Sequence, residues 1–236
     1  MPLTYAVGDV HGSLDKLTVL IEACRQHADG RALQFVFLGD YIDRGPDSAG
    51  VVRFMMRLRD ELDGRLIALR GNHEAFVLGL LDGIVPRGVW LGNGGVATLA
   101  SYGVREVGEL PRAHLDWMRA LRLSYDDGRR FFVHAGIHPD KPLDAQSERD
   151  LLWIREPFLS DGRDYGRLIV HGHTPVDTVT PDLHANRLNL DTGAVFGGPL
   201  TAAVFDDSQT VPLGYLQATP SLSLGWGYLP ATIRRM

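Results

Sequence analysis

The chain of 236 residues has very little cysteine, since Cys24 is the only one. An intramolecular disulfide is therefore impossible, and a metal site built from several thiolates is excluded as well. Cys24 lies in a stretch with helical apolar spacing, where a small buried thiol is the ordinary interpretation. The cysteine count is compatible with a reducing compartment.

Long apolar runs and an excess of positive charge are also missing. No segment approaches the roughly 18 apolar residues that a membrane-spanning helix requires, and the N-terminus has no basic segment followed by an apolar stretch. The formal net charge is −5, from 24 Lys and Arg against 29 Asp and Glu. This balance provides no basic footprint for nucleic acid or an anionic membrane. We expect a cytoplasmic protein with neither of them as a partner.

Flexible linkers, internal repeats and low-complexity tracts are absent too. The hydrophobic share of 44% and the charged share of 22% are those of an ordinary globular protein. We therefore predict a single domain over residues 1–236. The tail at 220–236 contains Trp226 and Tyr228 but no candidate catalytic residue, and we expect it to pack on the rest of the domain.

Apolar runs in the first third of the chain alternate with segments of helical spacing. We predict strands at Leu3–Val7, Leu33–Leu38 and Leu66–Leu69, and helices at Leu14–His27, from Pro46 to about Asp60, and at Glu74–Leu81. This order predicts parallel strands joined by right-handed crossovers. Later segments predict a helix at Pro111–Leu121 and strands at Leu168–Val170, Arg187–Leu190, Leu200–Phe205 and Val211–Leu216. The fold class is therefore α/β.

Five short blocks carry side chains of the kind that bind metals, and a strand-like run precedes most of them. The blocks are Gly8-Asp9-Val10-His11-Gly12, Gly39-Asp40-Tyr41-Ile42-Asp43-Arg44-Gly45, Gly71-Asn72-His73-Glu74, His134-Ala135-Gly136 and His171-Gly172-His173. Three of them lie at the carboxyl ends of successive predicted strands, where open α/β sheets carry their sites. Their Asp, His and Asn residues together indicate two adjacent divalent cations.

The spacing of these side chains explains how they could hold metal. Asp9 and His11 are two residues apart at a strand end, so their side chains point the same way and can hold one cation. The carboxylate of Asp40 has two oxygens, which can bridge cations about 3.5–4 Å apart. The other ligand-type side chains are Asn72, with an amide oxygen, and His134 and His173, with imidazole nitrogens. A mixed nitrogen and oxygen set suits Mn, Fe or Zn.

These blocks, in this order, resemble the phosphoprotein phosphatase (PPP) family of metallophosphatases. The resemblance runs from Gly8 to about Pro199 and is closest to the bacterial and phage-type protein serine/threonine phosphatases. Supporting blocks are Leu91-Gly92-Asn93-Gly94-Gly95, Trp153-Ile154-Arg155-Glu156, His173-Thr174-Pro175 and Asp191-Thr192-Gly193-Ala194-Val195-Phe196. The resemblance implies a calcineurin-like fold, in which helices flank a central β-sandwich that carries the metals at its edge.

The resemblance also implies two divalent metal ions as cofactors. Manganese is the first expectation, with iron or zinc as alternatives. The first ion would be bound by Asp9, His11 and Asp40, and the second by Asp40, Asn72, His134 and His173. We expect the neighbouring His171 not to bind metal, but to line the wall of the site or pack behind the metal ligands.

The remaining roles follow from the same resemblance. His73 would protonate the leaving alkoxide, and Asp43 would orient it. Arg44, Arg70 and, as in the bacterial and phage subgroup, Arg155 would bind the phosphate, whose edge matches a guanidinium fork. The implied reaction is direct attack by a metal-bound hydroxide on a phosphoprotein or phosphopeptide, with no phosphoenzyme. Regulatory subunits are not indicated.

Three other functions remain open. A symmetrical dinucleoside-tetraphosphate hydrolase has similar blocks, but such enzymes typically lack the aspartate found here as Asp43 and have Asp in place of Glu74. Broader calcineurin-like nucleases and phosphodiesterases usually carry Gly-His-x-His, whereas residue 175 is Pro. A non-catalytic phosphate-binding protein is disfavoured because every metal and acid position is filled. Glu74 itself is expected to make structural hydrogen bonds.

Overall fold

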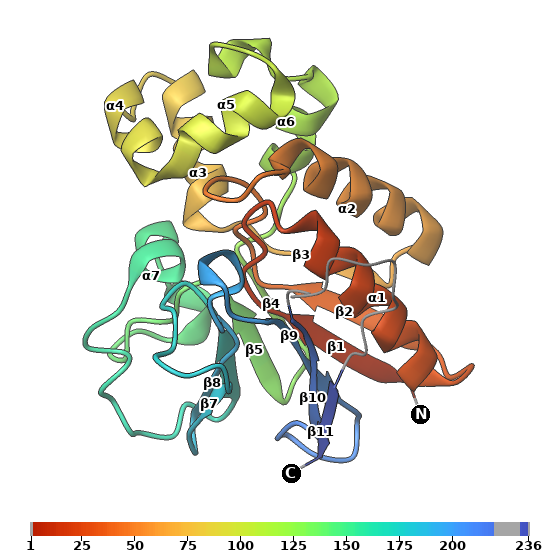
Figure 1. Cartoon of the computed structure of the whole chain (residues 1–236). Helices are drawn as coiled ribbons and strands as arrows, with labels where there is room; N and C mark the ends of the chain where they lie inside the picture. Colours follow the sequence, from red (N-terminus) through yellow and green to blue (C-terminus); the bar gives the residue numbers. More distant parts are fainter. Residues whose placement is uncertain (1, 220–231, 236) are drawn as a thin grey trace.

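The computed structural model describes residues 2–219 and 232–235, whose strands form two mixed sheets flanked by helices (Figure 1). The first sheet has the order β11-β10-β9-β1-β2-β3. Its strands are β1 (Leu3–Val7), β2 (Leu33–Phe37), β3 (Leu66–Ala68), β9 (Leu200–Phe205), β10 (Gly214–Ala218) and β11 (Thr232–Arg235). The second has the order β4-β5-β6-β8-β7. Its strands are β4 (Ser124–Asp126), β5 (Arg130–Val133), β6 (Leu168–His171), β7 (Asp182–Leu183) and β8 (Arg187–Asn189).

The helices form an outer layer with a separate group above the sheet edge. They are α1 (Leu14–Ala28), α2 (Ser48–Leu62), α3 (Asn72–Leu81), α4 (Arg87–Trp90), α5 (Val96–Tyr102), α6 (Arg112–Arg119) and α7 (Glu148–Trp153). In Figure 1, α1 and α2 lie along the first sheet, α7 lies beside the second, and α3 to α6 gather at one end of the molecule. A π-helical turn, Leu91–Gly95, joins α4 to α5.

Alternation of side chains along the strands explains the layers. In β1, Leu3, Tyr5 and Val7 pack in the cluster that includes α1 and α2, whereas Ala6 packs in a second cluster with Phe132 of β5. Successive residues of a strand face opposite sides, so a strand buried throughout has a hydrophobic layer on each face. The cluster shared by the two sheets is the interior of a β-sandwich, which confirms the predicted fold class.

The predicted parallel strands are confirmed, although the sheets are mixed. β1 pairs in parallel with β2, and β2 with β3. On its other side β1 pairs antiparallel with β9, which pairs antiparallel with β10. Apolar runs in the second half of the chain revealed these strands but not their direction, because a strand buried on both faces has the same pattern in either orientation.

Several element boundaries differ from the predicted ones by two or three residues. The second helix begins at Ser48, not at Pro46, because the Asp47 side chain accepts a hydrogen bond of 2.7 Å from the Gly50 amide and so caps the helix. The third helix begins at Asn72, two residues earlier than predicted. This shift places Asn72 and His73 in its first turn.

The tail of the chain adds an edge strand. Thr232–Arg235 pairs antiparallel with β10. Trp226 and Tyr228, for which packing on the domain was predicted, lie outside the described residues.

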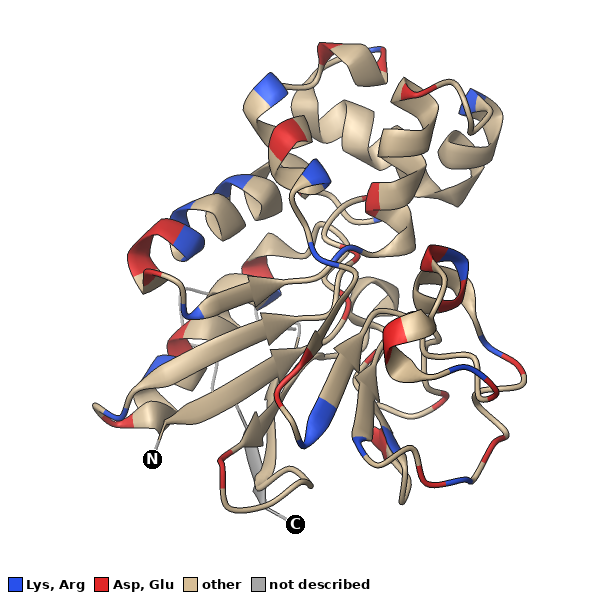
Figure 2. Ribbon diagram, turned by 180° about the vertical axis from the view of Figure 1, so that it is seen from behind, with Lys and Arg blue, Asp and Glu red and all other residues tan. Residues whose placement is uncertain are grey.

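Charged side chains lie mainly outside the sheets. In Figure 2, Lys and Arg alternate with Asp and Glu over helices and loops, and most strand residues are uncharged. Within the described part of the chain, no helix has the length and apolar character needed to cross a membrane.

Candidate metal centre

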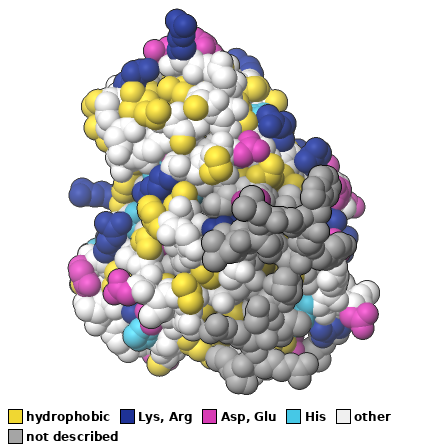
Figure 3. Space-filling view, viewed as in Figure 1, with side chains coloured by type: hydrophobic (Ala, Val, Ile, Leu, Met, Phe, Trp, Pro, Cys, Tyr) yellow, Lys and Arg dark blue, Asp and Glu magenta, His cyan; other side chains and the backbone are white. Residues whose placement is uncertain are grey.

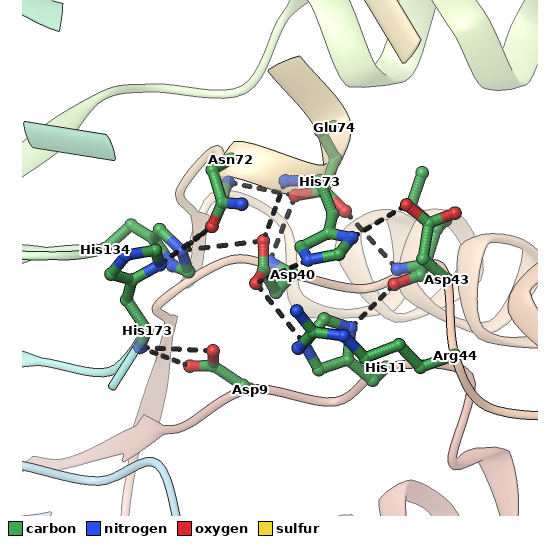
Figure 4. Close-up of polar contacts among 12 residues, drawn as sticks. Asp9, His11, Asp40, Asp43, Arg44, Asn72, His73, Glu74, His134 and His173 are labelled. Carbon is green, nitrogen blue, oxygen red and sulfur yellow. Dashed lines mark hydrogen bonds and ion pairs between the residues drawn. The ribbon is translucent and has the colours of Figure 1, made fainter. Parts of the chain in front are cut away.

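Parallel strands bring the five blocks to one edge of the sandwich. β1, β2 and β3 are parallel in the first sheet, and β5, β6 and β8 in the second. The side chains that follow their carboxyl ends meet in one cluster (Figure 4). Asp9 follows β1, Asp40 follows β2, Asn72 opens α3 after β3, His134 follows β5, and His173 follows β6. The structure therefore brings all six predicted metal ligands, His11 included, into one region.

The loops that present these side chains have an unusual backbone. Among the described residues, seven non-glycine residues have a positive φ, and five of them are His11, Asp40, Asp43, Arg44 and His173. This conformation costs of order 1–3 kcal/mol at each such position and persists where surrounding structure enforces it. Close packing enforces it here, since a Cβ on Gly45 would lie 1.8 Å from the carbonyl oxygen of His11. Strain is thus concentrated at the cluster.

One half of the cluster places hydrogen-bond acceptors against one another. The Nδ1 of His134 lies 2.9 Å from the Leu38 carbonyl oxygen and donates to it. Burial lowers the pKa of His134, so the ring is neutral and its Nε2 has only a lone pair. That Nε2 lies 2.8 Å from Oδ1 of Asn72 and 3.5 Å from Oδ1 of Asp40. A cation between these atoms would turn the opposed acceptors into ligands.

His173 completes this half of the cluster. Its Nδ1 lies 2.9 Å from the same oxygen of Asn72, and its Nε2 is buried without a hydrogen-bond partner. Burial and the neighbouring His134 lower the pKa of His173 to about 3, so it is neutral at ordinary pH. One atom each of Asp40, His134 and His173 lies within 4.8 Å of the others. With Asn72 they form a nitrogen and oxygen set that fits a divalent cation.

The other half of the cluster is centred on His11. Its Nδ1 donates to the Ile42 carbonyl oxygen at 2.8 Å, and burial lowers its pKa to about 3. Its Nε2 therefore has a lone pair, 3.3 Å from Oδ2 of Asp40. The guanidinium of Arg44 donates to the same Nε2 at 2.7 Å. A metal bound to this nitrogen would have to displace Arg44, which would free the guanidinium to bind an anion.

Asp9 lies close to both halves but is held differently. Its carboxylate accepts from the His173 amide at 3.1 and 3.2 Å, and the group of atoms within 4.8 Å around His11 contains Asp40 and His73 rather than Asp9. The glycine before His173 is needed for this contact, because a Cβ on Gly172 would lie 2.0 Å from Asp9 Oδ1. Asp9 thus contacts the backbone of His173, a predicted ligand of the second metal, and is not in the close group around His11.

The acidic side chains have the electrostatics expected of a cation site. Burial raises the pKa of Asp9 well above its ordinary value, and Asp191 and Asp40 raise it further. Burial also raises the pKa of Asp191 to about 6. Burial opposes ionisation of Asp40 as well, but the neighbouring His73, through its charge and the hydrogen bond from its amide, lowers the Asp40 pKa. Mutually repelling buried carboxylates are stabilised when cations bind between them.

His73 lies between the metal ligands and Asp43. Its Nδ1 is 2.7 Å from Oδ2 of Asp43, and both side chains are fully buried. Burial opposes protonation of His73, but Asp40 and the hydrogen bond to Asp43 raise its pKa above the ordinary value. Its Nε2 has no hydrogen-bond partner and lies 3.9 Å from Oδ2 of Asp40. The ring can therefore hold a proton on the nitrogen nearest the cluster.

Glu74 makes the structural hydrogen bonds that the sequence predicted. It is fully buried, and its two oxygens accept backbone N–H groups from Asp40, Tyr41, Ile42 and Gly71 at 2.8–3.3 Å. Burial, with Asp40 nearby, raises its pKa to about 7. Glu74 therefore ties the Asp40 loop to the start of α3.

The three predicted phosphate-binding arginines lie at different distances from the cluster. Arg44 contacts a predicted metal ligand, as described above. Arg155 donates to Oγ1 of Thr174 at 3.3 Å, next to His173. Arg70 instead donates to the Arg119 carbonyl oxygen at 2.9 Å and pairs with Glu148. In Figure 3, Lys and Arg side chains gather around a hollow between the upper helices and the sheets. A phosphate role for all three stays a prediction.

The structure also reveals polar residues at the site that the sequence prediction omitted. Trp90 and Thr98 donate hydrogen bonds to Asp43, and Asp191 is buried near Asp9. The sequence signal was the block Leu91–Gly95, which lies between Trp90 and Thr98, and the block Asp191–Phe196, which begins at Asp191. Neither block indicated a contact with Asp43. His171 is buried, with its ring 5.0 Å from that of Phe158, and it is not among the residues grouped as possible metal ligands in the described part of the chain.

Comparisons with known proteins agree with this geometry. Residues 3–204 match the family model described as calcineurin-like phosphoesterase. An asymmetrical bis(5′-nucleosyl)-tetraphosphatase of Geobacillus thermodenitrificans is 31% identical, over 87% of this chain and 91% of the relative. Serine/threonine-protein phosphatase 1 of Salmonella typhimurium is 32% identical, over 84% of this chain and 90% of the relative.

Solved structures show the same fold at lower identity. A protein serine/threonine phosphatase from Saccharomyces cerevisiae, with similarity to human phosphatase PP5, superposes with a TM-score of 0.63 at 14% identity. The match covers 94% of this chain and 81% of the yeast chain. At that identity the likeness supports the arrangement of sheets and helices only.

Proposed function

The chain belongs to the calcineurin-like phosphoesterase family, and from that premise we propose that it hydrolyses phosphoserine and phosphothreonine in proteins. The observation that carries the proposal is the buried pair of Asp43 and His73, 2.7 Å apart. An alkoxide is a poor leaving group, so breaking its bond to phosphorus benefits greatly from an acid. The phosphate leaving groups of a polyphosphate need far less protonation.

In the proposed reaction, each residue at the cluster has a separate role. His73 holds a proton on Nε2 and delivers it to the leaving oxygen as the P–O bond breaks, while water supplies the oxygen that forms the new bond to phosphorus. The products are the free hydroxyl and inorganic phosphate. Arg44 and Arg155 bind the phosphate oxygens. The six predicted ligands would hold two divalent cations, which would lower the pKa of a bound water toward neutrality and offset the phosphate charge.

Replacement of the acid tests this proposal. His73→Asn should lower kcat on a phosphoserine peptide by roughly 10²- to 10⁴-fold, with Mn²⁺ present throughout. The same variant should lose much less on p-nitrophenyl phosphate, whose leaving group needs little protonation. Equal losses on the two substrates would remove His73 from the acid role. Elemental analysis of bound manganese would verify that the substitution leaves the metal content unchanged.

A second candidate function is hydrolysis of dinucleoside tetraphosphates. Relatives bearing that name support it, and so do two exposed aromatic rings beside the cluster. Phe196 is 65% exposed, with its ring centre 5.6 Å from the Arg44 guanidinium, and Trp153 is 38% exposed, 6.2 Å from the His173 ring. Exposed rings of this kind can stack on nucleobases.

The two candidates differ in substrate preference and in the effect of Phe196. A protein phosphatase should have the higher kcat/KM on a phosphoserine peptide, and a tetraphosphatase on diadenosine tetraphosphate. If Phe196 stacks on a base, Phe196→Ala should lower kcat/KM on the dinucleotide by roughly 5- to 150-fold, in line with about 1–3 kcal/mol for base stacking. A much higher kcat/KM on the dinucleotide, lost in Phe196→Ala, would replace the first proposal by the second.

A further inference from the structure

The carboxylate of Asp43 is held by more partners than an acid dyad requires. Besides the Nδ1 of His73, the indole Nε1 of Trp90 lies 2.9 and 3.1 Å from its two oxygens, and the Thr98 hydroxyl donates to Oδ1 at 2.6 Å. Asp43, Trp90 and Thr98 are all fully buried. A buried carboxylate without access to water needs such donors because its oxygens would otherwise lack hydrogen-bond partners, and the directions of the donors fix its plane.

These donors come from the helical group above the sheets, not from the loops that carry the metal ligands. Trp90 ends α4 and Thr98 lies in α5. The π-helical turn Leu91–Gly95 connects the two helices. Gly95 packs directly under the Trp90 ring, since a Cβ there would lie 2.5 Å from the ring. The turn thus places the indole N–H and the threonine hydroxyl on opposite ends of one short connection, aimed at a single carboxylate.

The same turn also contacts the backbone beside Asp43. The carbonyl oxygen of Gly94 accepts from the Arg44 amide at 3.1 Å, and Gly94 has a φ of +106°. A Cβ at Gly94 would lie 2.7 Å from that amide nitrogen. These close contacts explain why residues 94 and 95 of the turn are both glycine. The metal site alone does not require glycine at either position.

We propose that Trp90 and Thr98 are positioning residues, which hold Asp43 so that it directs the proton-bearing Nε2 of His73 toward the leaving oxygen. This inference rests on the proposed acid role of the Asp43–His73 pair. Among the described residues, neither side chain makes a hydrogen bond to a predicted metal ligand, whereas both hydrogen-bond Asp43, so we expect both to act through Asp43. Their loss should lower proton delivery while leaving phosphate and metal binding intact.

Trp90→Phe tests the inference because it removes the N–H and keeps most of the ring. We expect kcat on a phosphoserine peptide to fall roughly tenfold, a fraction of the 10²–10⁴ that general acid catalysis supplies. KM, manganese content and kcat on p-nitrophenyl phosphate should change little. Trp117→Phe is the matched control, since Trp117 is also buried, on α6, with its ring 5.0 Å from Tyr41. It should show no such selectivity.

Thr98 provides a second test that keeps the tryptophan. Thr98→Val removes the hydroxyl and should give the same selective loss, whereas Thr98→Ser retains it and should restore activity. If Trp90→Phe prevented folding, this pair of variants would still decide the question. A loss equal on both substrates, or no loss, in both Trp90→Phe and Thr98→Val would overturn the inference.

A double-variant comparison separates this inference from the proposed function. Asp43→Asn alone should reduce phosphoserine turnover selectively, and Trp90→Phe added to it should cause no further loss if Trp90 acts only through Asp43. Additive losses would show that Trp90 has a general structural role, and the inference would be wrong. If Asp43→Asn itself showed no selectivity for the leaving group, the acid role would fail, and the inference with it.

Discussion

Replacing Glu74 with glutamine changes one heavy atom in a buried carboxylate that accepts four backbone N–H groups. Oε1 accepts the amides of Tyr41 and Ile42, and Oε2 accepts those of Asp40 and Gly71. In either orientation of the new amide, its NH₂ faces two backbone N–H donors. Two buried donors without an acceptor cost about 1–3 kcal/mol each.

For two donors the cost is about 2–6 kcal/mol. We expect the free energy of unfolding to fall by an amount at the lower end of this range, about 2 kcal/mol. Burial, with the charge of Asp40, raises the pKa of Glu74 to about 7, so part of the stabilisation by hydrogen bonds is already offset. For a domain of this size, a loss of about 2 kcal/mol lowers Tm by roughly 4–8 °C. Cation affinity should fall as well, because in either orientation the backbone at residues 40–42 loses at least one of its hydrogen bonds to Glu74.

Thermal unfolding followed by circular dichroism, with and without Mn²⁺, measures both effects. The matched control is Glu61→Gln, which removes a carboxylate that is 57% exposed and pairs with Arg25 at 2.7 Å. An exposed pair contributes about 0.2–1 kcal/mol. If Glu74→Gln lowered Tm no more than Glu61→Gln, the four hydrogen bonds would not stabilise the loop as described.

Three further substitutions address the metals and the helical turn. Arg44→Met should tighten binding of the first cation by about tenfold or more. The reason is that it removes both a hydrogen bond to the ligand nitrogen of His11 and a nearby positive charge. Weaker cation binding in isothermal titration calorimetry would contradict this. Asp40→Asn should leave at most one manganese per chain by elemental analysis, since no carboxylate would remain to bridge the pair, and two per chain would refute the bridge. Gly94→Ala should destabilise the protein by about 1–3 kcal/mol in urea unfolding because of its positive φ and its contact with Arg44. Gly92→Ala, where an added Cβ meets no atom within 4 Å, should be nearly neutral, and similar losses in both variants would argue against the packing of this turn.

The sequence alone revealed the residues of the cluster because strand ends and ligand types recur together. Each predicted ligand follows a strand or opens the helix after one, and parallel strands end at a common edge. The strands of the second half were less informative. β9 and β10 are buried on both faces, so their residues indicate strand but not direction. The antiparallel pairing of β9 with β1, and of β10 with β9, required the tertiary structure.

Local patterns predicted which side chains meet at the cluster, because the type of a side chain and its spacing from a strand end are properties of short segments. Which donors surround them was decided by tertiary packing alone. Trp90 and Thr98 are 47 and 55 residues from Asp43, and no periodicity or spacing relates segments so far apart. The contacts of Asp43 follow from how a helical turn seats above the sheet edge, which depends on the packing of whole elements.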